Sequence, residues 1–226
     1  MTARKIKSFV LRSGRISAAQ EKSYSTGKRF LIPYTGEAAD FSRYFGNDHS
    51  LTVEIGFGMG KATAEIAAAN PGKNYLGIEV FKAGIGKLLW EIERHSLSNV
   101  MIIEHDAVLV IENMIVPGSV DAFHLFFPDP WPKKRHHKRR LVQRPFAELL
   151  VSRLREGGYL YMVSDWENYA EEALAVLSAV PDFFNPHDGF SPPCSWRPTT
   201  QFEKKGLDKN HMIKEIYMVK KTMRRF

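Results

Sequence analysis

The most informative stretch for the fold is Val53-Glu54-Ile55-Gly56-Phe57-Gly58-Met59-Gly60, in which three glycines alternate with larger side chains. An apolar run leads into it and a helical pattern follows, so it is predicted to turn from a buried strand into a helix. Glycine adopts positive φ without strain and lets a ligand approach the backbone. Such turns also occur without a ligand. Position 61 is Lys61, where a dinucleotide fingerprint requires a further glycine, and this disfavours a nicotinamide enzyme.

On both sides of this turn, short apolar runs alternate with longer helical patterns, as they do in parallel βαβ units. Strands are predicted at 51–57, 74–80, 100–105, 120–127, 158–164 and 213–220. Helices are predicted at 61–69, 83–95, 107–114, 141–154 and 166–180. We therefore expect an α/β protein with a mostly parallel central sheet and helices on both faces. Residues 1–35 are predicted to form a basic N-terminal arm and residues 36–226 one domain, in which 181–199 gives no clear pattern.

Three acidic residues end or follow successive predicted strands. Glu54 lies at the end of the first strand, Glu79 at the end of the second and Asp106 after the third. Ligands of open α/β sheets bind beyond the carboxyl ends of the strands, where an acid commonly accepts hydrogen bonds from ribose hydroxyls. We therefore expect these acids to line a nucleoside-binding site. Asp106 also precedes a predicted helix, so it is equally suited to cap that helix.

The run Phe127-Pro128-Asp129-Pro130-Trp131-Pro132 begins at the end of the fourth predicted strand, and six of the next eight residues are Lys or Arg. Each proline restricts its own φ and biases the preceding residue, so Asp129 is expected on a stiff turn. A rigid acid beside a dense cationic strip suits a site that binds a polyanion and presents a polar group to one base. This combination indicates a nucleic-acid substrate. Two alternatives stay open: the strip as a plain solvated loop, and Trp131 as a core residue rather than a base-stacking one.

The net charge of +7 is concentrated at the two ends of the chain. Residues 1–30 contain eight Lys or Arg and one acid, and residues 204–226 contain eight and two. Together with the strip, these cations form a continuous surface if the fold brings them together. No apolar run reaches the roughly 20 residues of a membrane span, and the basic N-terminus lacks the apolar core of a signal peptide. We expect a cytoplasmic protein without a membrane partner, with a mitochondrial transit peptide as an alternative for the N-terminus.

Cysteine and histidine usage argues against a metal centre. Cys194 is the single cysteine, which excludes an intrachain disulfide and any multi-cysteine zinc site, and its neighbours show no nucleophile pattern. His136 and His137 have no further ligands at metal-binding spacing, so we expect them to contact phosphate. The prediction is a protein without a metal cofactor.

The glycine turn and the three acids resemble a Rossmann-like class I methyltransferase that binds S-adenosylmethionine. The loop narrows this to a resemblance to the bacterial tRNA (guanine-N7-)-methyltransferase family. The matching pieces are Ser8-Phe9-Val10-Leu11-Arg12-Ser13-Gly14-Arg15, Glu54-Ile55-Gly56-Phe57-Gly58-Met59-Gly60, Gly77-Ile78-Glu79, Phe127-Pro128-Asp129-Pro130-Trp131-Pro132-Lys133 and Thr200-Gln201-Phe202-Glu203. The first piece disfavours a transit peptide. The resemblance spans most of the chain, leaving about 181–196 unmatched; its loop motif is specific, whereas many methyltransferases share the glycine turn.

The resemblance also implies roles for individual residues. S-adenosylmethionine would contact Glu54, Gly56, Gly58, Glu79, Asp106 and Asp129. Asp129 would also be the catalytic carboxylate. The substrate nucleotide would contact Lys133, Asp165, Thr200, Gln201, Phe202 and Glu203, and the RNA backbone Arg135, His136, His137, Lys138, Arg139 and Arg140. Where the family also has Tyr, this chain has Phe202, which can stack but offers no hydroxyl. Without the resemblance, Thr200 and Glu203 would be a helix capping box, and Asp165 a helix cap.

The function implied by the resemblance is transfer of the methyl group of S-adenosylmethionine to N7 of a guanosine in the variable loop of tRNA, by a monomer or homodimer. N7 carries a lone pair and no proton at neutral pH, so alignment rather than a base should supply most of the catalysis. The guanine ring becomes cationic as the methyl group is transferred. A carboxylate that accepts a hydrogen bond from the N1–H edge of this ring therefore stabilises the transition state. A small-molecule methyltransferase is disfavoured by the cationic strip. An RNA-binding module on a degenerate fold is disfavoured by the complete set of acids.

Overall fold

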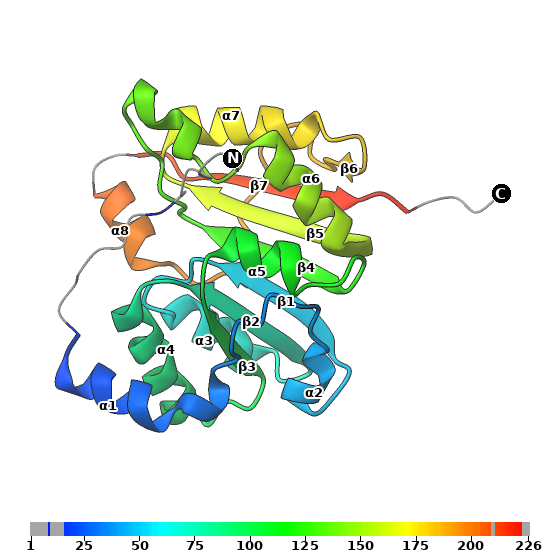
Figure 1. Cartoon of the computed structure of the whole chain (residues 1–226). Helices are drawn as coiled ribbons and strands as arrows, with labels where there is room; N and C mark the ends of the chain where they lie inside the picture. Colours follow the sequence, from blue (N-terminus) through cyan, green and yellow to red (C-terminus); the bar gives the residue numbers. More distant parts are fainter. Residues whose placement is uncertain (1–8, 10–15, 209–210, 223–226) are drawn as a thin grey trace, which may run out of the picture.

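The computed structural model of the protein describes Phe9, residues 16–208 and residues 211–222 (Figure 1). In these residues one sheet contains seven strands: β1 Ser50–Ile55, β2 Lys73–Glu79, β3 Val100–Glu104, β4 Val120–Phe126, β5 Leu154–Ser164, β6 Phe183–Phe184 and β7 Lys214–Lys220. The α-helices are α1 Ala18–Thr26, α2 Phe41–Phe45, α3 Lys61–Ala69, α4 Lys82–Arg94, α5 Ala107–Asn113, α6 Arg144–Arg153, α7 Glu167–Ser178 and α8 Gln201–Leu207. Two short 3-10 helices, η1 Lys28–Phe30 and η2 Lys134–Arg139, complete the described elements.

The order of the strands determines where a ligand can bind. They are arranged as β3-β2-β1-β4-β5-β7-β6, with β1 to β5 parallel and β7 antiparallel to both of its neighbours. From β1 the chain moves outward to β2 and β3, and β4 then returns to the other side of β1. Such a reversal opens a crevice beyond the carboxyl ends of the two central strands. The predicted α/β fold with a mostly parallel sheet is confirmed.

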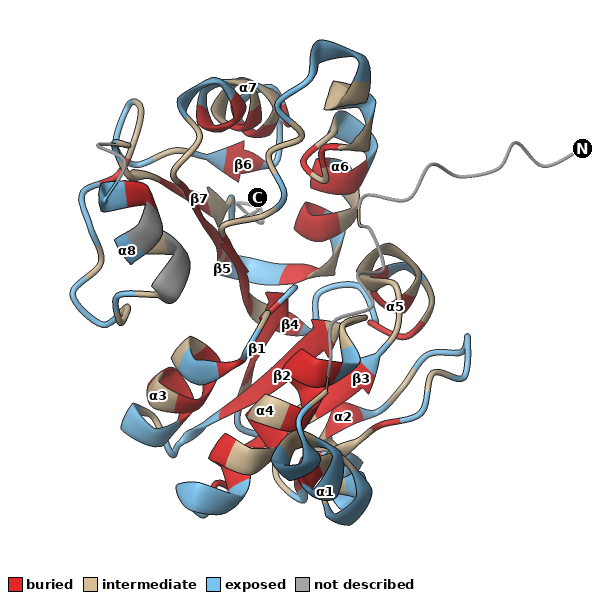
Figure 2. Ribbon diagram, turned by 90° about the vertical axis from the view of Figure 1, so that its left-hand side faces the viewer, coloured by how far each residue is buried: buried red, intermediate tan, exposed pale blue. Residues whose placement is uncertain are grey.

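Helices cover both faces of the sheet, and both faces are apolar. Successive residues of a strand point to opposite faces. In β5, Leu160 and Met162 pack with residues of α5, α6 and α7, whereas Tyr161 and Val163 pack with residues of α3 and α4. Figure 2 shows the buried residues concentrated in the strands and in the helix faces turned toward them. Burial on both sides explains why the strands appear in the sequence as continuous apolar runs.

The predicted strands and helices are confirmed, and the largest difference lies around α6 and β5. α6 begins later than predicted because Pro145 is tolerated in its first turn, whereas in a longer helix the ring would clash with the carbonyl group of Leu141. β5 begins at Leu154, directly after this helix, and its pairing with β4 shifts register where Gly157 adopts a φ of 71°. The unpredicted stretch 181–199 contains the two-residue strand β6.

The second half of the predicted arm packs on the body of the protein. α1 begins with a capping box between Ser17 and Gln20 and lies along α4. Gly86 permits this close contact, because a Cβ there would lie 2.5 Å from the carbonyl oxygen of Gln20. Further along, the N–H of Ile32 donates to the carbonyl oxygen of Ile102 at 2.8 Å, and the Ile32 side chain joins the core. Leu31 and Ile32 thus lie along the β3 edge of the sheet while α1 packs on α4, and the arm boundary at residue 35 stays a prediction.

Candidate active site

A cavity of about 300 Å³ lies beyond the carboxyl ends of β1 and β4, where the strand order reverses. Its walls come from the glycine turn after β1, the end of β2, the start of α5, the loop after β4 and the start of α8. The predicted site residues that line it are Glu54, Gly56, Gly58, Glu79, Asp129 and Thr200. Phe9, from the predicted arm, lines the same cavity. The fold therefore brings residues from distant parts of the chain to one place.

The glycine turn forms the floor of this cavity. Gly56, Gly58 and Gly60 have φ values of 72°, 57° and 68°, which L-residues adopt only with strain. A Cβ at Gly56 would meet nothing within 4 Å, so this glycine borders open space. A Cβ on Gly84 would lie 1.9 Å from the carbonyl oxygen of Gly58, so the first turn of α4 supports the glycine turn from behind. The turn is thus open toward the cavity and held rigidly on the other side.

Two carboxyl groups flank the turn, that of Glu54 buried and that of Glu79 partly buried. Glu54 is 4% exposed, and burial, with a smaller contribution from Glu79, raises its pKa to about 7. The Glu79 carboxylate accepts hydrogen bonds from the N–H groups of Gly58 (2.9 Å), Val80 (2.7 Å) and Phe81 (3.0 Å). Burial raises the pKa of Glu79, these N–H groups oppose the rise, and the Asp129 carboxylate adds to it. Glu79 therefore lies close enough to affect Glu54 and to be affected by Asp129, and this accumulation of negative charge at the cavity favours a cationic ligand.

The loop that carries Asp129 is constrained on both sides. Asp129 lines the cavity and is exposed. Phe127 and Trp131 adopt φ values of 51° and 46°, a left-handed conformation that costs a non-glycine residue about 1–3 kcal/mol. The N–H of Phe127 donates to the carbonyl oxygen of Val163 at 2.8 Å, so the loop starts from a fixed point on the sheet. Strain of this kind persists only where the surrounding structure enforces it.

The basic strip forms η2 and presents most of its cations to solvent. Lys133, Lys134, Arg135 and Lys138 are exposed, and His136, His137 and Arg139 are partly buried. The Arg139 guanidinium lies 4.7 Å from the centre of the Trp131 ring, and the His136 ring meets the same indole edge-on at 5.8 Å. Trp131 therefore packs against the strip itself, and the exposed cations remain available to a polyanion.

Arg140 is the exception within the predicted RNA-contacting strip. It is 2% exposed, and its guanidinium pairs with Glu172 of α7. Its side chain therefore does not lie on the surface with the other cations.

Asp106 caps α5, as its position in the sequence allowed. Its carboxylate accepts a hydrogen bond from the N–H of Val108 at 2.9 Å. Its two neighbours, His105 and Ala107, line the cavity. The His105 ring stacks on Tyr34 with centroids 3.7 Å apart and the rings nearly parallel. His105 was not predicted as a site residue. Its position directly before Asp106 is the one feature of the sequence that pointed to a place in the cavity.

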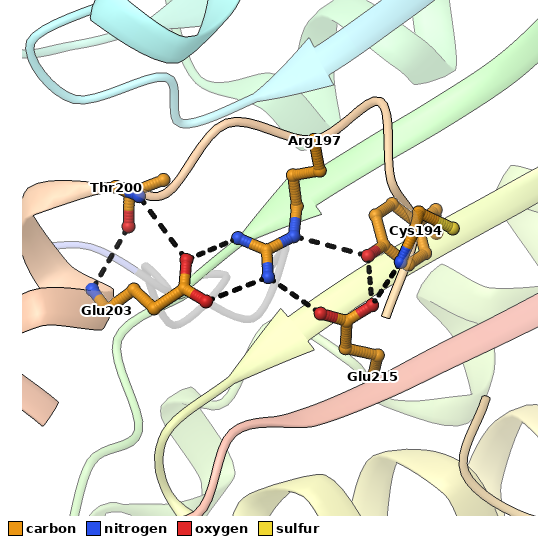
Figure 3. Close-up of polar contacts among 6 residues, drawn as sticks. Cys194, Arg197, Thr200, Glu203 and Glu215 are labelled. Carbon is orange, nitrogen blue, oxygen red and sulfur yellow. Dashed lines mark hydrogen bonds and ion pairs between the residues drawn. The ribbon is translucent and has the colours of Figure 1, made fainter. Parts of the chain in front are cut away.

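Thr200 and Glu203 form the capping box of α8. The Glu203 N–H donates to the Thr200 hydroxyl at 3.0 Å, and the Thr200 N–H donates to the Glu203 carboxylate at 3.3 Å. Figure 3 shows the Arg197 guanidinium between the carboxylates of Glu203 and Glu215. It contacts Glu203 at 2.5 and 3.0 Å and Glu215, in β7, at 2.6 Å. Both Glu203 oxygens are thus engaged within the protein, and Thr200 is the member of the pair that lines the cavity.

Tyr161 and Cys194 extend this network toward the sheet. Glu215 accepts hydrogen bonds from the Tyr161 hydroxyl and from the backbone N–H of Cys194. The Nε of Arg197 donates to the Tyr161 hydroxyl at 3.2 Å. Burial and the hydrogen bond to Glu215 raise the pKa of Tyr161. Through Arg197, the wall of the cavity at α8 is therefore joined to β5 and β7.

The remaining predicted substrate residues lie near α8 and η2. Asp165 faces His211 at 3.4 Å and packs against Gly206, where a Cβ would lie 3.0 Å from the Asp165 Cβ. It does not cap α7, whose N-cap is Trp166 and has no side-chain hydrogen bond. Lys133 precedes η2 and is exposed. Gln201 and Phe202 form the first turn of α8, and their side chains lie outside the described part of the structure.

Thr199 and Lys204 also line the cavity and were not predicted, although they flank the Thr200 motif. Within the described residues, no helix is both long and apolar enough to cross a membrane. In the same part of the chain, no group of three or more His, Cys, Asp or Glu side chains is placed to hold a metal ion.

Comparison with known proteins relates the chain to methyltransferases. A family model described as "Putative methyltransferase" matches residues 48–216. A protein of Paraburkholderia xenovorans (strain LB400) named tRNA (guanine-N(7)-)-methyltransferase is 48% identical over 219 residues, which cover 96% of this chain and 84% of that protein. A protein of the same name from Burkholderia lata is 48% identical over 220 residues, covering 97% and 86%.

Solved structures of other methyltransferases share the fold at low sequence identity. The antibiotic-resistance methyltransferase Kmr has a TM-score of 0.58 and 14% identity, covering 85% of this chain and 95% of Kmr. The 16S rRNA methyltransferase KamB has a TM-score of 0.56 and 11% identity, covering 97% of this chain and 100% of KamB. At these identities the likeness concerns the fold alone, and the predicted Rossmann-like methyltransferase fold is confirmed.

Proposed function

The chain belongs to the tRNA (guanine-N(7)-)-methyltransferase family, and we propose that its cavity binds S-adenosylmethionine beside Asp129. The activity in that name, methyl transfer to N7 of guanine in tRNA, is the function of this chain. The observation that carries the assignment of the site is that Asp129 lines the same cavity as the glycine turn, Glu54 and Glu79.

The cavity suits S-adenosylmethionine, which supplies an electrophilic methyl group on a sulfonium centre. The open space at Gly56 leaves room beside the backbone for such a ligand. Glu54 and Glu79 provide negative charge for its cationic groups, and Glu79 ends β2, where an acid commonly accepts from ribose hydroxyls. Asp106 stays a predicted contact, supported by the cavity-lining position of its neighbours.

Asp129 would act on the guanine as the ring becomes positively charged. N7 already carries its lone pair, so the protein needs to align it with the methyl group rather than to remove a proton. Methylation makes the N1–H and the exocyclic amine better hydrogen-bond donors. A carboxylate held beside that edge then binds the transition state more tightly than the ground state. The constrained backbone at Phe127 and Trp131 supports this role, because such an acceptor must not move.

tRNA would reach this cavity over η2 and α8. The exposed cations of η2 suit phosphate, while Thr200 and Lys204 suit the nucleotide that enters. That the guanosine lies in the variable loop, and that the protein is a monomer or a homodimer, stay predictions.

The proposal is tested by replacing Asp129 with Asn, which keeps the shape and removes the charge. We expect kcat to fall about 100-fold or more while the Kd for tRNA stays within about two-fold. Methyl transfer is measured with unmodified tRNA and labelled S-adenosylmethionine, and the modified base is mapped by chemical strand cleavage at 7-methylguanosine.

The matched control is Asp182→Asn, which alters an exposed acid after α7 and should leave kcat unchanged. Weaker tRNA binding with unchanged kcat in Asp129→Asn would make Asp129 a binding residue only. Unchanged kcat and unchanged binding would remove it from the site.

A further inference from the structure

Arg140 is a buried cation at the end of a strip that otherwise faces solvent. It is 2% exposed, whereas Lys138 is exposed and Arg139 partly buried. A buried guanidinium requires partners in several directions because its desolvation is costly.

The guanidinium is held in three directions. Its Nε donates to the carbonyl oxygen of Pro130 at 3.0 Å. One terminal nitrogen donates to Asn168 at 2.9 Å and the other pairs with the Glu172 carboxylate. Its carbon lies 5.0 Å from the centre of the Tyr169 ring. Three of these four partners belong to α7, so Arg140 connects one backbone carbonyl group to a helix.

That carbonyl group belongs to the residue directly after Asp129. The loop begins at the bond from Phe127 to Val163 and is also held at Pro130 by Arg140. Between these two points lie Pro128 and Asp129. The left-handed conformations of Phe127 and Trp131 cost energy, and contacts of this kind can hold them in place.

α7 is a stable base for this contact because its other face is buried in the core. Tyr169, Ala173 and Leu177 are fully buried against the sheet. The Tyr169 hydroxyl also accepts the N–H of Val142 at 3.2 Å, which fixes the chain just after Arg140. The arginine therefore transmits the position of a rigid helix to the loop.

We propose that Arg140 is a positioning residue for methyl transfer, which holds the Asp129 carboxylate through the carbonyl group of Pro130 and does not contact RNA. The inference rests on the proposed role of Asp129. Only arginine offers a planar fork that reaches Pro130, Asn168 and Glu172 together; lysine keeps the charge but has one nitrogen.

The test is Arg140→Lys, made in the wild type and in Asp129→Asn. A displacement of about 1 Å at a catalytic group lowers the rate about 100-fold, so we expect kcat of the single variant to fall about 10- to 100-fold. The KM for tRNA and the salt dependence of its affinity should change little. In Asp129→Asn the same substitution should lower kcat by less than about two-fold, because a residue that acts through Asp129 has nothing left to position.

Arg144→Lys is the matched control, since this arginine is exposed and pairs with Glu148 one turn along α6. A raised KM with a shallower salt dependence in Arg140→Lys would make Arg140 an RNA contact and overturn the inference. An equal fall of kcat in both backgrounds, or an unchanged kcat, would also overturn it. If Asp129→Asn alone keeps wild-type kcat, the proposed role of Asp129 fails instead, and the two failures are distinguishable.

A milder variant covers the case in which Arg140→Lys does not fold. Asn168 is exposed at the start of α7 and supplies one partner of the guanidinium, so Asn168→Ala should fold. We expect its kcat to fall about 2- to 10-fold with the tRNA affinity unchanged. An unchanged kcat would contradict the inference.

Discussion

At the scale of single residues, Glu54 has a carboxyl group whose burial beside the cavity costs stability. Glu54 is buried without a cationic partner among its described contacts, and Glu79 lies near enough to raise its pKa further. A core built for stability alone would hold an apolar residue at this position, one residue before the end of β1. Strongly perturbed acids in a cavity are typical of functional sites. The negative charge at Glu54 is therefore most useful when a cationic ligand is bound.

Replacing Glu54 with Gln should change how stability depends on pH. The pKa of about 7 lies above the ordinary 4.5, so Glu54 contributes stability that is fully present below about pH 4.5 and lost as the pH rises through about 7. Relative to Glu54→Gln, the free energy of unfolding of the wild type should fall by up to about 3 kcal/mol as the pH rises across this range. Chemical denaturation of both proteins at several pH values measures the difference. A difference that does not vary with pH would contradict the assigned burial.

At the scale of elements, α8 depends on a charge network and not on apolar packing alone. Arg197 joins the capping box of α8 to Glu215 in β7 and Tyr161 in β5 (Figure 3). The Arg197 and Glu215 side chains are 4% and 2% exposed, so their charges are balanced inside the protein. This network orients the segment that brings Thr200 to the cavity.

Replacing Arg197 with Ala should destabilise the fold, because two largely buried carboxylates lose their cation. We expect the free energy of unfolding to fall by about 3–5 kcal/mol at neutral pH. Denaturant titration of the variant and the wild type at this pH measures the loss. Arg144→Ala, which breaks an exposed pair within α6, should cost less than about 1 kcal/mol. Similar losses in the two variants would show that the Arg197 network adds nothing beyond a surface pair.

At the scale of the whole molecule, the fold places the candidate site residues together at the carboxyl ends of the parallel strands. The glycine turn, the Asp129 loop and the exposed cations of η2 all follow the carboxyl ends of parallel strands. Lys73 begins β2 and therefore lies at the amino ends of these strands, on the opposite side of the sheet from the cavity. This polarity predicts that tRNA is bound by one side of the protein only.

Salt dependence of tRNA affinity distinguishes the two sides. Each phosphate contact contributes about 0.7–0.9 to the slope of log affinity against log salt concentration, so Arg135→Gln should make the slope shallower by that amount. Lys73→Gln removes one exposed cation at the amino ends of the strands and should leave the slope unchanged. Filter binding at several salt concentrations measures both. Equal effects of the two substitutions would indicate nonspecific attraction by net charge.

The sequence alone was sufficient for the features that depend on neighbouring residues. Apolar runs of strand length, the alternate glycines at 56–60 and the prolines around Asp129 restrict the backbone locally, so the fold class and the glycine-turn and Asp129 segments at the cavity could be predicted. The burial of Arg140 and the ion pair of Glu203 with Arg197 could not be predicted in this way, although the capping box of Glu203 with Thr200 could. Arg140 stands among surface cations, and its partner Glu172 is 32 residues away, on α7. Glu203 stands in a substrate-like motif, and the fold places Arg197 between it and Glu215 of β7. Burial is a property of the folded chain. It decides whether a charged side chain is available to a ligand or forms ion pairs that stabilise the protein.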